Sequence, residues 1–128
     1  MSRAVICSAV RTPIGKFLGG LSELSPADLG VAAVVPALER AGVSADRVGE
    51  LRFGCGRQAG GGPNVARQIA VRSGIPVTST AVTVNMACGS GLLAIMEARD
   101  AIERGEFEVV VAGGTESMSQ LPFYMLGA

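Results

Sequence analysis

The sequence contains no histidine and no tryptophan, and aromatic residues make up only 4% of its 128 residues. Without histidine, the chain lacks the commonest general base and the commonest metal ligand. Its three cysteines, Cys7, Cys55 and Cys88, are widely spaced, odd in number and never paired as Cys-x-x-Cys. This pattern argues against a disulfide framework and against a metal site, and it favours a reducing, cytoplasmic location.

Charge is sparse as well, at 17% of the residues, and the formal net charge is zero. Lysine and arginine are scattered singly and few rings are available for base stacking, so a nucleic-acid partner is not expected. No apolar run is long enough to span a bilayer, and the N-terminus lacks the layout of a cleavable signal peptide. The apolar fraction of 48% instead predicts one globular domain with a substantial core.

Apolar runs with β-branched residues alternate with runs of helical period. Strands are predicted at 4–10, 47–55, 79–87 and 107–114, with helices at 24–42, 64–74 and 89–105 between them. This alternation predicts an α/β fold with a mostly parallel sheet and helices on both faces. The valine-rich runs 4–10 and 107–114 are expected to be central strands of a four-stranded sheet.

Helix-end signals support the three predicted helices. Ser25 and Asn64 are expected N-caps, and Pro36 is expected to kink or split the first helix. The third helix carries an apolar stripe on one face. The stripe consists of Leu92, Ile95, Met96 and Ile102.

Cys88 stands where the third strand meets the third helix and is followed by Gly-Ser-Gly. Free N–H groups and the positive helix end stabilise a thiolate there, and they could hold an oxyanion formed by its attack on a carbonyl. Gly89 and Gly91 have no side chain to obstruct that approach. The residues alone leave a buried packing cysteine as an equal alternative. For Cys7 and Cys55, packing is the expected role.

Two other patterns are weaker. Residues 54–59 fit a relaxed G-x-G-x-x-A dinucleotide fingerprint, but Gly and Pro at 60–63 delay the helix and no acidic residue ends the next strand. A nucleotide-binding oxidoreductase is therefore a distant alternative. Glu116 could act as a general base, although a loop carboxylate that caps nearby N–H groups is the preferred interpretation.

Five segments occur in an order that identifies a resemblance: AVRTPIGKFLG, LERAGV, ARQIAVRSGIP, VNMACGSGLLAI and VVVAGGTESMS. Together they resemble the N-terminal part of thiolases, which are acyl-CoA acyltransferases of acetoacetyl-CoA and 3-ketoacyl-CoA chemistry. The resemblance implies that Cys88 is the nucleophile, which takes an acyl group from acyl-CoA and gives it to a second CoA-bound carbanion. Coenzyme A thioesters would be substrates, and no bound cofactor is implied.

The resemblance also implies an organisation. Residues 1–118 would form the nucleophile-bearing thiolase half-fold, and 119–128 would begin a lid domain. A second half, in the same or a partner chain, would supply a histidine, a second cysteine and another oxyanion donor, so this chain alone is expected to be inactive. Thiolases pair through their N-terminal halves, which implies a homodimer or higher oligomer with 80–86 as the contacting edge strand.

Some residues depart from the thiolase pattern. Met86 and Ala87 stand where thiolases usually carry Lys or Gln and an apolar residue, and Pro63 and Val65 alter the G-Q-N-P-A-R-Q segment. The acyl-chain length and the direction of the reaction therefore stay open. Two further alternatives are a ketosynthase-like condensing enzyme fragment and a non-catalytic assembly subunit that would tolerate loss of Cys88.

Overall fold

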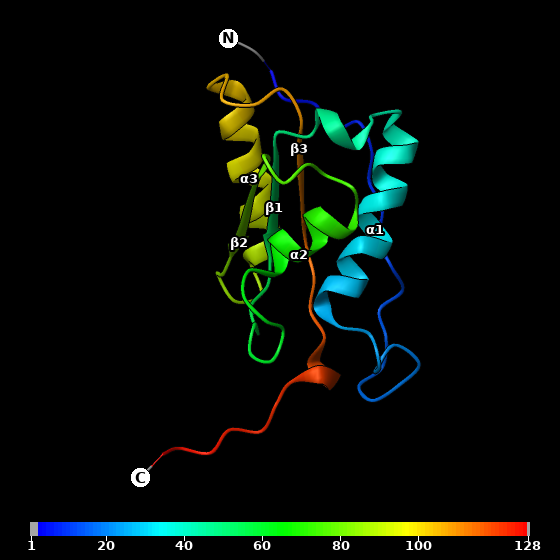
Figure 1. Cartoon of the computed structure of the whole chain (residues 1–128), viewed down its shortest axis with the longest axis vertical. Helices are drawn as coiled ribbons and strands as arrows, with labels where there is room; N and C mark the ends of the chain where they lie inside the picture. The colour runs from blue at the N-terminus through cyan, green and yellow to red at the C-terminus, as the bar shows by residue number, and fades with distance from the viewer. Residues whose placement is uncertain (1–2, 128) are drawn as a thin grey trace.

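The structure is a computed structural model that describes residues 3–127 (Figure 1). Three parallel strands form one sheet in the order β2-β1-β3, with two helices on one face and one on the other. The elements are α1 (Pro26–Ala41), β1 (Glu50–Gly54), α2 (Val65–Arg72), β2 (Thr80–Val84), α3 (Ser90–Glu103) and β3 (Val110–Gly114), with short 3-10 helices at Ala45–Arg47 and Met118–Gln120. The predicted α/β class, with a parallel sheet and helices on both faces, is confirmed.

Local signals account for the helix ends. Ser25 caps α1 in a capping box with Asp28, and the side chain of Asn64 accepts the N–H of Arg67 at the start of α2. Of the predicted kink or split at Pro36, the split is wrong, because α1 runs through Pro36 as one helix. Proline leaves the carbonyl of Ala32 without its helical donor, and Ala32 is exposed, so water can serve that carbonyl. Of the helices within residues 3–127, none is long and apolar enough to cross a membrane.

The central strand β1 has two different faces. Leu51 and Phe53 are buried in the apolar core that the sheet forms with α1 and α2. On the other face, Arg52 pairs with the buried Glu50 at 2.9 Å and with Glu97 of α3 at 2.7 Å. The helix that begins just after Cys88 is therefore tied to the sheet by charged groups.

The apolar stripe of α3 does not face the sheet. Leu92, Ile95 and Met96 are 62%, 44% and 47% exposed. The residues of α3 that are buried are small ones: Ser90, Ala94, Ala98 and Ala101. Small side chains let the helix approach the strands closely, so Leu92, Ile95 and Met96 are left on its outer side, while Ile102 is half-buried.

The N-terminal run 4–10 is not a strand, which corrects the prediction of four strands. Residues 3–16 form no regular element, and Val5 and Ile6 are 72% and 80% exposed. β1 is central, whereas β3 lies at one edge of the sheet. The apolar pattern of a run indicates that it favours burial, but a strand also needs a pairing partner, and among residues 3–127 no strand pairs with 4–10.

Candidate active site

Cys88 lies on a tight elbow between β2 and α3, with its side chain exposed. The residue before it, Ala87, has a φ of +47°. A residue with a Cβ atom is strained in this left-handed region by roughly 1–2 kcal/mol. The thiol is therefore presented by backbone that neighbouring groups must hold in place.

Two side chains hold the elbow. Asn85 Oδ1 accepts the N–H of Ala87 at 3.0 Å, which closes an Asx turn around Met86. Ser90 Oγ accepts the N–H of Met86 at 2.8 Å and donates to the carbonyl of Ala87 at 2.6 Å. Sequence reasoning missed both roles. The signal that could have found them is an Asn two residues before a turn position and a Ser at the helix start.

The Cys88 elbow opens on a cavity of about 320 Å³. The cavity lies where β1 and β3 end and α3 begins, the edge of a parallel sheet at which ligands usually bind. Its lining, besides Cys88, is Gly54, Gly56, Ala87, Ser90, Gly91, Gly114, Thr115 and Glu116. Because glycine supplies half of those residues, the site is shaped largely by backbone and has room for an extended ligand.

Glu116 borders the same cavity and caps the loop that follows β1. Its Oε2 accepts the N–H of Gly56 at 3.0 Å and its Oε1 accepts the N–H of Arg57 at 2.9 Å. The sulfur of Cys55 lies 3.4 Å from Oε1. These contacts support the capping interpretation of Glu116, because both carboxylate oxygens are already engaged by donors.

The structure separates the three cysteines. Cys55 is buried, and this burial, together with the nearby charge of Glu116, raises the pKa of its thiol to about 12. Cys55 therefore stays protonated at neutral pH and has the expected packing role. Cys7 is exposed, so the packing role expected for it is wrong. The reason is that 4–10 is not a buried strand.

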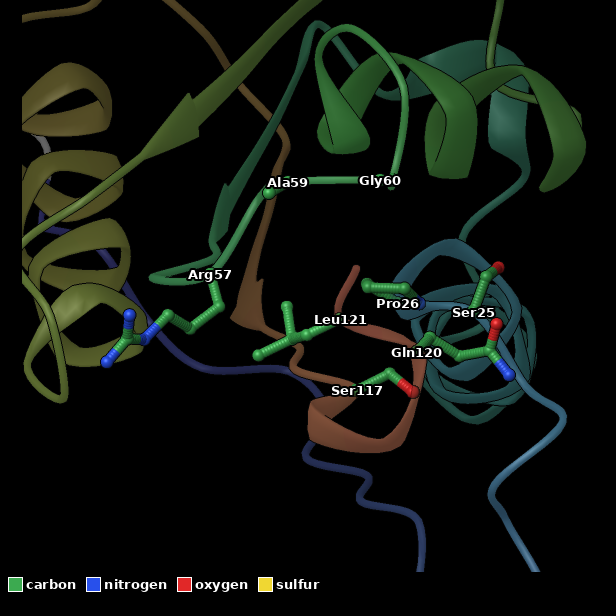
Figure 2. Close-up of a pocket in the computed structure, with 9 residues that line it drawn as sticks. Ser25, Pro26, Arg57, Ala59, Gly60, Ser117, Gln120 and Leu121 are labelled. Carbon is green, nitrogen blue, oxygen red and sulfur yellow. The ribbon is translucent and has the colours of Figure 1, made fainter. Parts of the chain in front are cut away.

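A smaller cavity, of about 40 Å³, lies between the start of α1 and the 57–61 loop (Figure 2). Its lining includes Ser25, Gln120 and Arg57, but the Arg57 side chain points away from the other two. No cysteine lines this cavity, and the hydroxyls of its two serines, Ser25 and Ser117, are engaged in hydrogen bonds with Asp28 and with the carbonyl of Leu24. The cavity has space for only a few water molecules. Within residues 3–127, no group of three or more His, Cys, Asp or Glu side chains is placed to hold a metal ion.

The G-x-G-x-x-A segment at 54–59 does not open a helix, since α2 begins only at Val65. A dinucleotide fingerprint needs its glycines at the helix start, where N–H groups meet the pyrophosphate. The structure therefore offers no support for the nucleotide-binding alternative.

The fold and the elbow together define an α/β domain that presents one exposed thiol at the carboxyl edge of a parallel sheet. The family model described as the thiolase N-terminal domain matches residues 4–126, and the chain belongs to the thiolase family. The resemblance read from the five motifs is thus confirmed.

Known relatives agree with this assignment. The chain is 46% identical to acetyl-CoA acetyltransferase of Cupriavidus necator, over all of this chain and 33% of that protein. It is 44% identical to the Syntrophomonas wolfei acetyl-CoA acetyltransferase, over 97% of this chain and 31% of that protein. The chain therefore spans about a third of the length of these relatives.

Solved structures give the same picture. Acat5 thiolase from Ascaris suum, in complex with coenzyme A, superposes with a TM-score of 0.98 at 41% identity, over 99% of this chain and 33% of that one. The acetyl-CoA acetyltransferase of Bacillus anthracis superposes with a TM-score of 0.94, also at 41% identity, over 98% of this chain and 32% of that one.

Proposed function

We propose that this chain supplies the nucleophile, Cys88, for thiolase acyl transfer on coenzyme A thioesters. The observation that carries the proposal is the exposed Cys88 thiol, held on a strained elbow that opens on the cavity at the end of the sheet. The proposed reaction is a Claisen condensation or its reverse, thiolytic cleavage, with an acyl-cysteine intermediate. The relatives named acetyl-CoA acetyltransferase make a short acyl group the first substrate to test.

In the first step, the Cys88 thiolate attacks the carbonyl carbon of acetyl-CoA. The new S–C bond forms as the carbonyl electrons move to oxygen, and the backbone N–H of Cys88 is the proposed oxyanion donor. Collapse of this intermediate breaks the bond between the carbonyl carbon and the coenzyme A sulfur. Coenzyme A leaves as a thiolate and the acetyl group stays on Cys88, so atoms and charge balance.

A complete cycle also needs a group to take the thiol proton. The 128 residues hold no histidine, and the Glu116 oxygens are engaged by N–H groups. We therefore propose that acetylation of Cys88 by this chain alone is slow and that turnover requires a second part bearing a histidine and a second cysteine. No resident cofactor is needed for this chemistry.

The experiment is incubation with acetyl-CoA followed by peptide mass spectrometry. One acetyl group on the peptide that contains Cys88, absent in Cys88→Ser and unchanged in Cys7→Ser, is the expected result. Acetylation of Cys7 at the same rate, or none at Cys88 even with a complementing thiolase part present, would overturn the proposal. If the proposal is overturned and Cys88→Ser still assembles with its partner as the parent chain does, the non-catalytic assembly subunit is the favoured alternative.

A further inference from the structure

A continuous path of hydrogen bonds joins the three loops that follow the three strands. After β3, Glu116 Oε2 accepts the N–H of Gly56 at 3.0 Å. After β1, the carbonyl of Gly56 accepts Nδ2 of Asn85 at 3.0 Å. After β2, Asn85 Oδ1 accepts the N–H of Ala87 at 3.0 Å. The path therefore runs from a carboxylate to the residue that precedes Cys88.

Gly56, in the middle of this path, is closely packed against its neighbours. A Cβ atom at Gly56 would lie 3.2 Å from Glu116 Oε2 and 3.4 Å from the carbonyl oxygen of Ala87. The peptide of Gly56 is thus packed directly between the carboxylate and the elbow. A shift of the 55–57 loop would be transmitted to Asn85 and then to Ala87, since little free space separates them.

Ala87 is the residue that needs such support. Its φ of +47° is unfavourable for a side chain with a Cβ atom, so it relaxes unless its surroundings hold it. The Asx turn from Asn85 supplies part of that restraint, and the orientation of the Asn85 amide depends in turn on its bond to Gly56. Glu116 is the anchor, because two backbone N–H groups of the 55–57 loop end on its carboxylate.

We propose that Glu116 is a positioning residue for Cys88, acting through Gly56 and Asn85 to keep Ala87 in the left-handed conformation that presents the thiol. The inference rests on the proposed role of Cys88 as nucleophile. It assigns Glu116 no proton transfer. The role gives a structural reason for a carboxylate at the border of the cavity of the proposed nucleophile.

The test is a double-mutant cycle between Glu116→Gln and Ala87→Gly. Glutamine has the same shape as glutamate, but its NH₂ group is a donor and cannot accept a backbone N–H. One of the two hydrogen bonds from the 55–57 loop is therefore lost. Glycine adopts positive φ without strain, so the elbow no longer needs to be held. The readout is the iodoacetamide alkylation rate of Cys88 relative to Cys7 in the same chain. Glu108→Gln, at an exposed ion pair, is the matched control.

With Ala87 present, Glu116→Gln is expected to slow Cys88 alkylation by about tenfold. In the Ala87→Gly background, the same substitution should change the rate by less than about threefold, because coupled residues are non-additive. Hydrogen exchange at the Ala87 amide should accelerate in Glu116→Gln, while the Leu51 amide in the core keeps its rate. Equal losses in both backgrounds, or faster alkylation from removal of the negative charge, would overturn the proposal.

Asn85→Ala gives a second route if Glu116→Gln does not fold, as judged by circular dichroism. This substitution breaks the same hydrogen-bond path beyond Gly56. The decrease in the Cys88 alkylation rate that it causes should also be smaller in the Ala87→Gly background. Acetylation by acetyl-CoA, measured in parallel, separates the two proposals. If alkylation shows the coupling but the parent chain is not acetylated even with a complementing thiolase part present, the positioning role stands and the acyl-transfer function fails.

Discussion

A Cβ atom on Gly54 would lie 2.4 Å from the backbone carbonyl carbon of Ser90. The last residue of β1 therefore touches the first residue of α3 directly, with no side chain between them. This contact sets how far the start of α3 lies from the sheet, and with it the position of Cys88, two residues earlier.

Gly54→Ala is expected to push the start of α3 away from β1. No flexible side chain can absorb the overlap, because the atoms that the new methyl group meets first are backbone atoms of Ser90 and Gly91. The free energy of unfolding should fall by about 1–3 kcal/mol, measured by urea titration. Gly20→Ala, which meets nothing within 4 Å, is the control and should be close to neutral. An unchanged stability for Gly54→Ala would contradict the close packing.

Asp28→Ala should weaken the start of α1 by about 1 kcal/mol, because it removes the capping box. The hydrogen bonds from Ser25, followed by that from Arg72, lower the pKa of Asp28 from 3.8 to about 2. Because the pKa of this carboxyl is lower in the folded chain than in the unfolded chain, its charged form stabilises the fold at pH values above the unfolded pKa. This contribution is lost as the pH falls from about 4 to about 2.

The check for Asp28 is thermal unfolding of the parent and Asp28→Ala between pH 7 and pH 2. Their difference should be largest at neutral pH and should shrink toward pH 2. Asp46→Ala, at an exposed position outside the capping box, is the control substitution. A stability difference between the parent and Asp28→Ala that does not change with pH would show that the charge of Asp28 is not its cause.

Cys55 should make the fold sensitive to alkaline pH. Its thiol pKa is about 12 in the fold against 9.0 ordinarily, so above pH 9 the unfolded chain loses a proton that the folded chain keeps. The free energy of unfolding of the parent should therefore fall by up to about 1.4 kcal/mol per pH unit as the pH rises from 9 toward 12. Denaturant titrations of Cys55→Ala should lack this slope, whereas Cys7→Ala should retain it.

The thiols should label in the order Cys88, Cys7, Cys55. Cys88 and Cys7 are both exposed, but only Cys88 lies at the start of a helix, and Cys55 is buried. Limiting iodoacetamide with peptide mass spectrometry measures the order. Cys7 reacting first would count against activation of Cys88 by the helix start, and Cys55 labelling in the native chain would show that the core opens readily.

We infer that the chain associates through β2, whose outer side pairs with no other strand of the described sheet. Asn64 covers part of that edge, because its Nδ2 donates to the carbonyl of Ala81 and its Oδ1 accepts from Thr83 Oγ1, so pairing would use the backbone groups that these contacts leave open. Light scattering should show a dimer or larger species whose fraction rises with concentration. A monomer at every concentration tested would contradict association through this edge.

Much of the fold could be read from residues that are neighbours in the chain. Ser25 and Asn64 cap helices through contacts that span only three positions, and the placement of Cys88 between a strand and a helix follows from the local pattern around it. Such signals depend on a few adjacent residues, so they survive without knowledge of the rest of the molecule. The five motifs then led to the thiolase family, which the matching domain confirms.

The tertiary structure decided what those local signals do not contain. It left 4–10 unpaired, placed β1 at the centre of the sheet and turned the Leu92 stripe outward. It also brought Glu116 to Gly56 across 60 positions of sequence, and Gly56 to Asn85 across 29. Contacts of this range depend on where three separate strands end in space. The sequence therefore determined where the thiol lies along the chain, and only the folded sheet decided which groups hold its elbow.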